Sequence, residues 1–177
     1  MQKRCWLFIL SSLLCVNLMG NNINLARTKL SKVTTIAQID TVLILIDDIN
    51  TPISKAYKGA YTMMKAKYVN SPFKKYAYFN EGKALIEKAI EQAPNNVEIR
   101  YLRATLQVKL PKFLNYYENI NDDIDFVLTN LKRAEISREV KYKIIINLVA
   151  ANLISNEQKA TIFYQMNYAR STSDISE

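Results

Sequence analysis

Residues 82–103 read GKALIEKAIEQAPNNVEIRYLR, and this stretch decides the fold class of the chain. Small and bulky apolar residues recur at steps of three or four until a Pro-Asn-Asn stop, which is the pattern of one helix face. The stop also caps a second helix, because Glu98 falls in the first turn of the next apolar pattern. The stretch therefore predicts two consecutive helices joined by a tight turn.

Signals for helix starts also occur on both sides of residues 82–103. A hydroxyl residue before a proline starts a helix at Thr51 and again at Ser71, because proline suits the first helical position. Ser155 and Gln158 form a capping box before the last helix. The predicted helices cover residues 36–49, 52–68, 72–92 and 97–110, a short one after 111, and others from about 122, 138 and 156.

Three further expectations concern parts of this pattern. Residues 21–32 are polar and aperiodic, which predicts an irregular lead-in. The helix at 36–49 should be buried over much of its circumference, since apolar residues surround it; a strand over VLILI is the alternative. The helix at 97–110 carries two apolar stripes, which predicts that it lies sandwiched between neighbours.

Composition supports one helical domain. Only three glycines and four prolines interrupt 177 residues, of which 49% are hydrophobic and 23% charged, so disorder and turn-rich β folds are disfavoured. The prediction is a single all-α domain of seven or eight helices over residues 21–170, with no strand or linker. Residues 171–177 form a polar tail that we expect to fray.

The first twenty residues predict a secretory signal peptide. A short basic start at Lys3 and Arg4 precedes an apolar run over 5–16 that is too short to span a bilayer, followed by small and polar residues. We therefore expect an exported protein, located in the periplasm, that is cut near Gly20.

Both cysteines lie in this leader. Cys15 raises the alternative of a lipidated bacterial lipoprotein, but the residue before a lipidated cysteine should be small, and here it is Leu14. Membrane association is expected only if Cys15 is lipidated. Without these cysteines the mature chain has no disulfide and no thiolate site.

Charge and histidine content limit which partners, catalytic groups and metal sites the chain can have. The formal charge is +8, yet the lysines are scattered, which predicts a solvated basic surface and no nucleic-acid partner. Histidine is absent, which removes the commonest general base and zinc ligand. The acidic cluster around Asp122, Asp123 and Asp125 lacks the glycine turn and spacing of a calcium loop, so helix capping explains it better. We expect no catalysis, no cofactor and no metal.

The candidate binding residues lie at the end of residues 82–103 and on an upstream helix. Arg100 and Arg103 predict either a buried pair with Asp122 or Asp123, which would lock two hairpins together, or an anion or peptide-carboxylate site. Tyrosine is frequent, and its rings either line helix interfaces or form an exposed groove for a peptide or glycan. The candidate binding residues are Arg100, Arg103, Tyr101, Tyr57 and Tyr61.

Gly82, Ile86, Ala89 and Pro94 resemble the second helix of a tetratricopeptide repeat, where small, large, small and proline residues recur at this spacing. No second full copy is present. Over residues 50–130, the segments AYKGAY, SPFKKYAYFNEGKALIEKAI, PNNVEIRYLR and LPKFLNYYENINDD resemble an uncharacterised family of small exported helical proteins from Bacteroidetes-type bacteria. The resemblance implies a tetratricopeptide-like fold and no known activity.

The sequence therefore predicts a non-catalytic binding or scaffold protein of the bacterial cell envelope, which recognises a protein or peptide through a helical-repeat-like surface. Two alternatives stay open at this stage. Helices that are apolar on two sides could enclose a small molecule or lipid, as in a carrier. Carboxylate or tyrosine chemistry in a helical cleft would instead make the protein an enzyme.

Overall fold

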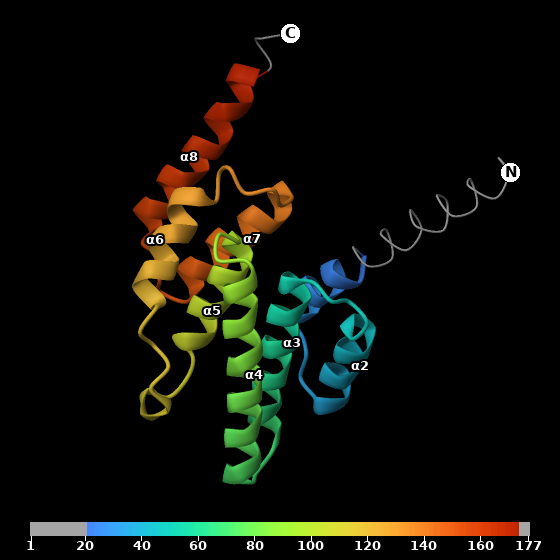
Figure 1. The fold of residues 1–177 in the computed structure, drawn as a ribbon. Helices are drawn as coiled ribbons and strands as arrows, with labels where there is room; N and C mark the ends of the chain where they lie inside the picture. The colour runs from blue at the N-terminus through green and yellow to red at the C-terminus, as the bar shows by residue number, and fades with distance from the viewer. Residues whose placement is uncertain (1–20, 174–177) are drawn as a thin grey trace, which may run out of the picture. The chain divides into compact units, whose positions relative to one another are not determined.

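The computed structural model describes residues 21–173, and Figure 1 shows them as helices joined by turns and loops. Every regular element in this range is helical, so the predicted all-α class is confirmed. The helices are α2 (Ile36–Ile46), α3 (Pro52–Lys65), η1 (Ala66–Tyr68), α4 (Pro72–Gln92), α5 (Val97–Gln107), η2 (Lys112–Leu114), α6 (Ile120–Asn130), α7 (Arg138–Ala150) and α8 (Asn156–Ser173). Residues 21–29 form a further helical segment. The predicted signal peptide at 1–20, with Cys15, lies outside the described residues.

The chain divides into two compact units between Gln92 and Ala93. The first unit holds the helical segment at 21–29 and the helices α2, α3, η1 and α4; the second holds α5, η2, α6, α7 and α8. The single domain over 21–170 stays a prediction.

Helices α3 and α4 form a tight hairpin that dominates the first unit, and they lie side by side in Figure 1. They meet through two glycines: a Cβ placed on Gly59 would lie 2.7 Å from the carbonyl oxygen of Gly82, and one on Gly82 would lie 2.6 Å from the carbonyl oxygen of Gly59. Because neither backbone can yield, only glycine permits this approach. The α4 face predicted to point inward is confirmed, since Phe79, Gly82, Ile86 and Ala89 are buried.

The start of α3 matches its sequence signal. Thr51 accepts a hydrogen bond from the Ser54 backbone amide at 3.2 Å, and the Ser54 hydroxyl accepts one from the Thr51 amide at 3.1 Å. This reciprocal capping box satisfies amides that the helix itself leaves unpaired, and proline occupies the first turn.

The lead-in predicted for residues 21–32 is wrong over most of its length. Residues 21–29 are helical, and Ile23 and Ala26 are buried at a spacing of three residues. The Tyr61 hydroxyl donates to the Ala26 carbonyl at 2.7 Å, which ties this segment to α3. Tertiary packing therefore stabilises this helix, which the local sequence pattern does not predict because only two of its apolar residues are buried among polar neighbours.

The expectation that the helix now seen as α2 is buried on much of its circumference is also wrong. Ile39, Val42 and Ile46 are buried, whereas Ile44 is 74% exposed and Leu45 is exposed as well. Helix α2 packs against α3, so one stripe finds a partner and the other faces away from it. The helix itself is confirmed over the strand alternative.

In the second unit, α5 packs against α6 and α7, as its two apolar stripes predict. Asn96 caps it by accepting from the amides of Glu98 at 3.0 Å and Ile99 at 3.1 Å. Arg103 and Gln107 are buried together with the apolar residues of α5. Burial on nearly all sides makes α5 the centre of this unit.

The remaining second-unit helices begin where the sequence predicts. Ser137 caps α7 by accepting from the Val140 amide at 3.3 Å, and Ser155 and Gln158 form the predicted capping box of α8. Helix α8 contacts α7 and continues to Ser173, so the first three residues of the predicted tail are helical. Residues 174–177 lie outside the described residues.

Candidate functional site

The two candidate arginines lie on one face of α5. Arg100 and Arg103 are three residues apart, so their side chains leave the helix on the same side, one turn from each other. The Asn96 cap fixes where the helix begins and hence where this face points.

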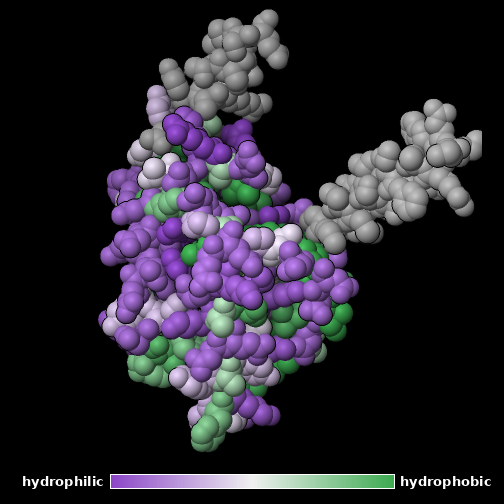
Figure 2. All heavy atoms as spheres, in the orientation of Figure 1, coloured by the Kyte–Doolittle hydropathy of each residue, from purple (hydrophilic) through white to green (hydrophobic). Residues whose placement is uncertain are grey.

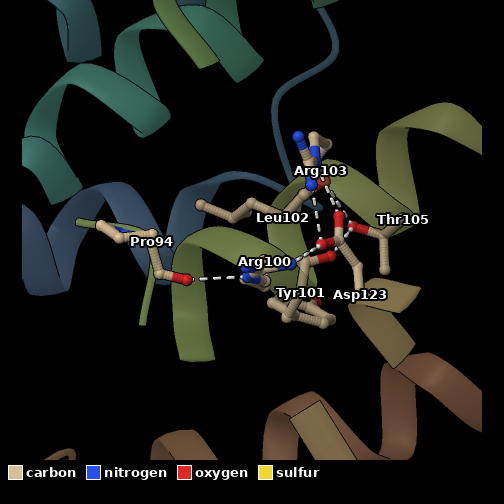
Figure 3. Close-up of polar contacts among 7 residues, drawn as sticks. All are labelled: Pro94, Arg100, Tyr101, Leu102, Arg103, Thr105 and Asp123. Atoms are coloured by element: carbon tan, nitrogen blue, oxygen red, sulfur yellow. Dashed lines mark hydrogen bonds and ion pairs between the residues drawn. The ribbon is translucent and has the colours of Figure 1, made fainter. Parts of the chain in front are cut away.

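Both arginines meet one carboxylate on α6, as Figure 3 shows. Arg103 donates from Nε to Asp123 Oδ2 at 2.6 Å and from Nη2 to Oδ1 at 2.8 Å, which is a bidentate pair. Arg100 donates from Nη1 to the same Oδ1 at 3.0 Å. Of the two partners the sequence offers, Asp122 and Asp123, the structure selects Asp123.

The surroundings of this cluster exclude water from the carboxylate. Asp123 is fully buried, Arg103 nearly so, and only Arg100 is partly exposed. Arg100 also donates from Nε to the Pro94 carbonyl at 2.8 Å, and its guanidinium lies 4.6 Å from the Phe126 ring centre. A buried carboxylate needs such full compensation, because desolvation of an unpaired charge is costly.

This geometry confirms the predicted buried pair that joins two helices. Asp123 sits in the first turn of α6 and is held from α5 by three charge-assisted hydrogen bonds. The bidentate face of Arg103 is occupied by Asp123, so it offers no open fork for a peptide carboxylate. We name Arg100, Arg103 and Asp123 the ion bridge.

The three candidate tyrosines are buried and not part of an exposed groove. Tyr57 and Tyr61 lie in the core of the first unit, and Tyr101 lies in the core of the second. Burial raises the pKa of Tyr61 far above its ordinary value. Burial is also the largest cause that raises the pKa of Tyr101, although its hydroxyl accepts a hydrogen bond from Asn147 Nδ2 at 2.7 Å. These two phenols stay protonated at neutral pH.

The acidic cluster resolves into separate roles. Asp123 belongs to the ion bridge, while Asp122 and Asp125 are exposed. Asp122 and Asp123 both lie in the first turn of α6, where a carboxylate favours the positive end of the helix dipole. Among residues 21–173, no group of three or more acidic side chains is arranged to hold a metal ion.

The structure also reveals exposed aromatic residues that pattern analysis misses. Phe73 and Tyr76 lie on the first turns of α4, and Phe113 and Tyr117 lie between α5 and α6. Phe73 and Phe113 both come shortly after a proline that starts a new element, and neither fits an apolar stripe, but this pattern alone does not show that they are exposed. Such side chains cannot be told from core residues by hydropathy alone.

No helix in the part of the chain that the structure describes has the length and hydropathy needed to cross a bilayer. Comparison with protein-family models, curated proteins and solved structures finds no match to this chain. The chain is thus characterised by its own geometry: an all-α fold with a buried ion bridge and two exposed aromatic segments.

Proposed function

We propose that this protein is an exported, non-catalytic binding protein of the bacterial cell envelope, which recognises a protein or peptide through its helical hairpins. We place the contact surface on the loop between α5 and α6, residues 108–117, named here the aromatic loop. The observation that carries the proposal is an ordered loop whose large apolar side chains face solvent.

The aromatic loop combines exposure with local order. Phe113 is 84% exposed, and Val108 and Tyr117 are exposed as well. Tyr116, by contrast, is buried and anchors the segment. Asn115 adopts the left-handed conformation with φ 48°, and its amide donates to the Lys112 carbonyl at 3.0 Å, which closes a tight turn. A backbone held in this way presents its side chains at little further cost in ordering entropy.

The residue types suit protein recognition. Aromatic residues are enriched at the centres of protein interfaces, where a few of them supply most of the binding energy. Contiguous exposed apolar residues on a folded protein commonly mark such a surface. The ion bridge supports the loop indirectly, because it joins α5 and α6, the two helices that the loop connects.

Two further observations support the proposal of an exported protein with tetratricopeptide-like hairpins. The close packing of α3 and α4 through Gly59 and Gly82 is the kind of helix approach expected in a tetratricopeptide-like hairpin. Export is supported by the leader pattern at residues 1–20, and the chain beyond this leader contains neither cysteine nor histidine.

The test is quantitative affinity capture from an envelope extract of the source bacterium. The double variant Phe113→Ser/Tyr117→Ser removes the exposed rings, while Ile146→Ser, which alters an exposed residue of α7, is the matched control. We expect a partner that wild type and control retain and the double variant loses, with at least about a tenfold weaker affinity when the purified pair is measured by calorimetry.

All three proteins must show the same helical circular dichroism for the comparison to count. A partner retained equally by the double variant would contradict the placement on the aromatic loop. If the wild type retains no protein beyond a heat-denatured sample of the same chain, recognition of an envelope protein is itself contradicted.

A further inference from the structure

Positive charge is unevenly distributed along the chain. Residues 21–92 carry eleven Lys and Arg against six Asp and Glu, whereas residues 93–177 carry eleven against ten. Within the first unit, residues 49–80 contain six lysines and not one acidic residue. The sequence position of this acid-free run coincides with the α3–α4 hairpin and its turn.

The six lysines have different partners. Lys55 donates to Gln92 Oε1 at 2.8 Å, Lys58 pairs with Asp47 at 3.5 Å, and Lys65 pairs with Asp40 at 2.6 Å. The other three lie at the end of the hairpin, are exposed, and make no ion pair with any residue in the described range. These three are Lys67, Lys74 and Lys75.

Aromatic side chains lie among these three lysines. Phe73 is 88% exposed and Tyr76 is 59% exposed, and a spacing of three residues puts them on one side of α4. Tyr68 is partly exposed, and its hydroxyl donates to the Val33 carbonyl at 3.1 Å, which holds the turn in place. We name this end of the hairpin, residues 67–76, the basic apex.

The basic apex is the turn at which α3 ends and α4 begins, at the lower end of Figure 1. At the same end of the space-filling view in Figure 2, apolar atoms project beside hydrophilic ones. Phe73 and Tyr76 are exposed together on one side of α4, and neighbouring exposed apolar residues commonly mark a protein or membrane interaction site.

We propose that the basic apex docks on the surface of an anionic lipid bilayer. Phe73 inserts its ring among the acyl chains, Tyr76 lies at the level of the headgroups, and the three lysines face the lipid phosphates. Aromatic rings and lysines take these positions at membrane interfaces because each keeps its polar end hydrated. Near an anionic surface each lysine strengthens binding by about fivefold.

Composition and form favour a bilayer over a macromolecular partner. Lysine is depleted in protein interfaces, whereas the apex carries three exposed lysines among its aromatic side chains. Single-stranded nucleic acid is normally held in a basic groove with a row of stacking rings. A projecting turn needs no such groove, because a bilayer surface is deformable and accepts single inserted side chains.

A local fluorescence reporter tests the insertion. The full chain contains one tryptophan, Trp6, so Trp6→Phe provides a silent background in which Phe73→Trp reports from the basic apex. The matched control reporter is Ile44→Trp, which lies on α2 of the same unit, is 74% exposed and has Asp47 nearby in sequence. Every variant keeps the same first twenty residues, so any effect of the leader is common to all.

The probes are vesicles of mixed phosphatidylcholine and phosphatidylglycerol, compared with vesicles of phosphatidylcholine alone. We expect the Phe73→Trp emission to shift to the blue and to be quenched by brominated acyl chains only in the anionic vesicles. Added salt should reverse the shift, because it screens the lysines. The Ile44→Trp reporter should not respond.

Charge variants in the reporter background test the role of the lysines. Lys74→Gln/Lys75→Gln should weaken vesicle binding of the apex reporter by about 25-fold. Lys88→Gln/Lys132→Gln changes the net charge equally at two lysines outside the apex and should weaken binding less than about threefold. Circular dichroism of each variant verifies the fold.

Three results would overturn the membrane proposal. The first is a Phe73→Trp reporter that responds no more than the Ile44→Trp reporter. The second is an equal loss in both charge variants, which would indicate only a diffuse attraction. The third is a blue shift with single-stranded RNA and none with vesicles, which would assign the apex to another polyanion. Phe113→Ser/Tyr117→Ser should leave vesicle binding unchanged, so this proposal and protein recognition by the aromatic loop can fail separately.

Discussion

Gln107 is the least satisfied polar residue of the described chain. It ends α5, its side chain is almost fully buried, and neither its amide nitrogen nor its amide oxygen has a hydrogen-bond partner among the described residues. A buried amide without partners loses its hydration and gains nothing in exchange. Gln107 therefore contributes packing volume without an intramolecular hydrogen bond that would offset the burial of its amide.

Gln107→Met keeps the length of the side chain and removes its polar atoms, so it should raise the free energy of unfolding by about 1 kcal/mol. Urea denaturation followed by circular dichroism measures the change. Gln107→Glu is the matched control and should destabilise, because it buries a charge. A methionine variant that is less stable than wild type would show that the amide is satisfied by a buried water.

Tyr61 makes the fold sensitive to alkali. Burial raises its pKa in the folded state above the ordinary value of 10.0, which its phenol regains when the chain unfolds. Above pH 10 the unfolded chain therefore releases a proton that the folded chain keeps, and stability falls as pH rises. Below pH 10 both states are protonated and the contribution is constant.

The midpoint of urea unfolding should thus decrease steeply between pH 10 and pH 11. Tyr61→Phe removes the titrating group, so its midpoint should decrease less over the same interval, even though it loses the hydrogen bond to Ala26 and is less stable at pH 7. Equal slopes for wild type and Tyr61→Phe would contradict the assignment to this tyrosine.

At the scale of elements, the α3–α4 hairpin depends on the absence of two side chains. A Cβ on Gly82 would lie 2.5 Å from Met63 Cγ and 3.0 Å from the Met63 backbone nitrogen, besides its contact with Gly59. Alanine normally stabilises a helix relative to glycine by about 1 kcal/mol. Here the added methyl group must push two backbones apart, so the sign should reverse.

Gly82→Ala should lower the free energy of unfolding by about 1 to 3 kcal/mol. Asn80→Ala on the exposed side of α4 is the control and should be neutral or slightly stabilising. Thermal unfolding by calorimetry compares the two. An alanine variant at least as stable as wild type would mean that the helices can separate without loss.

The ion bridge holds α5 and α6 together, as the close approach at Gly59 and Gly82 holds α3 and α4 together. Asp123→Asn leaves two guanidinium groups facing a neutral amide in a buried site, so it should cost about 3 to 5 kcal/mol. Asp122→Asn changes the exposed neighbour and should stay within about 0.5 kcal/mol of wild type. Chemical denaturation measures both; similar stabilities for the two variants would contradict a structural role for the bridge.

Element existence and bounds were largely predictable from sequence. The start of α3 at Pro52 and both ends of α4 follow from the hydroxyl-proline signals and the Pro-Asn-Asn stop, because such caps act locally. The helical segment at 21–29 was not predictable, since its stability comes from contact with Tyr61, 35 residues away from Ala26. Local pattern carries no record of such distant contacts.

The candidate site was also only partly predictable, because its residues could be placed on helices from local sequence but their contacts with other helices could not. The pairing of Arg100 or Arg103 with one of two aspartates followed from their spacing on predicted helices, although the sequence did not decide that both arginines share Asp123. The exposed tyrosine groove was wrong for Tyr57 and Tyr61, because amphipathic rings suit core and surface alike. Exposure of Phe73 and Phe113 required the structure.

For the whole molecule, the open question is whether the two units unfold together. The turn that links α4 to α5 is only four residues long and contains no linker sequence. We predict one cooperative domain, so Asp123→Asn in the second unit should reduce amide protection in α3 and α4 as much as in α5 and α6. Hydrogen exchange measured by NMR gives this comparison; unchanged protection in the first unit would identify two independent domains.

At the scale of the whole molecule, the proposed docking of the basic apex would give a route to membrane contact that does not depend on Cys15. Composition alone predicts membrane contact only through a lipid on Cys15, because scattered lysines are expected to be solvated. Folding brings Lys67 close to Lys74 and Lys75 by reversing the chain between α3 and α4. The turn therefore gathers lysines from the run at residues 49–80, where the sequence contains lysine but no acidic residue.

The shared carboxylate of the ion bridge has a kinetic consequence. Asp123 loses its water only when both guanidinium groups are in place, and those groups lie 20 and 23 residues before it in the chain. Before both groups are in place, hydration stabilises each charge more than pairing does. The bridge should therefore form after the main barrier to folding has been crossed. Its loss should then accelerate unfolding and leave the folding rate nearly unchanged. The bridge would act as a latch that sets how long the folded state lasts.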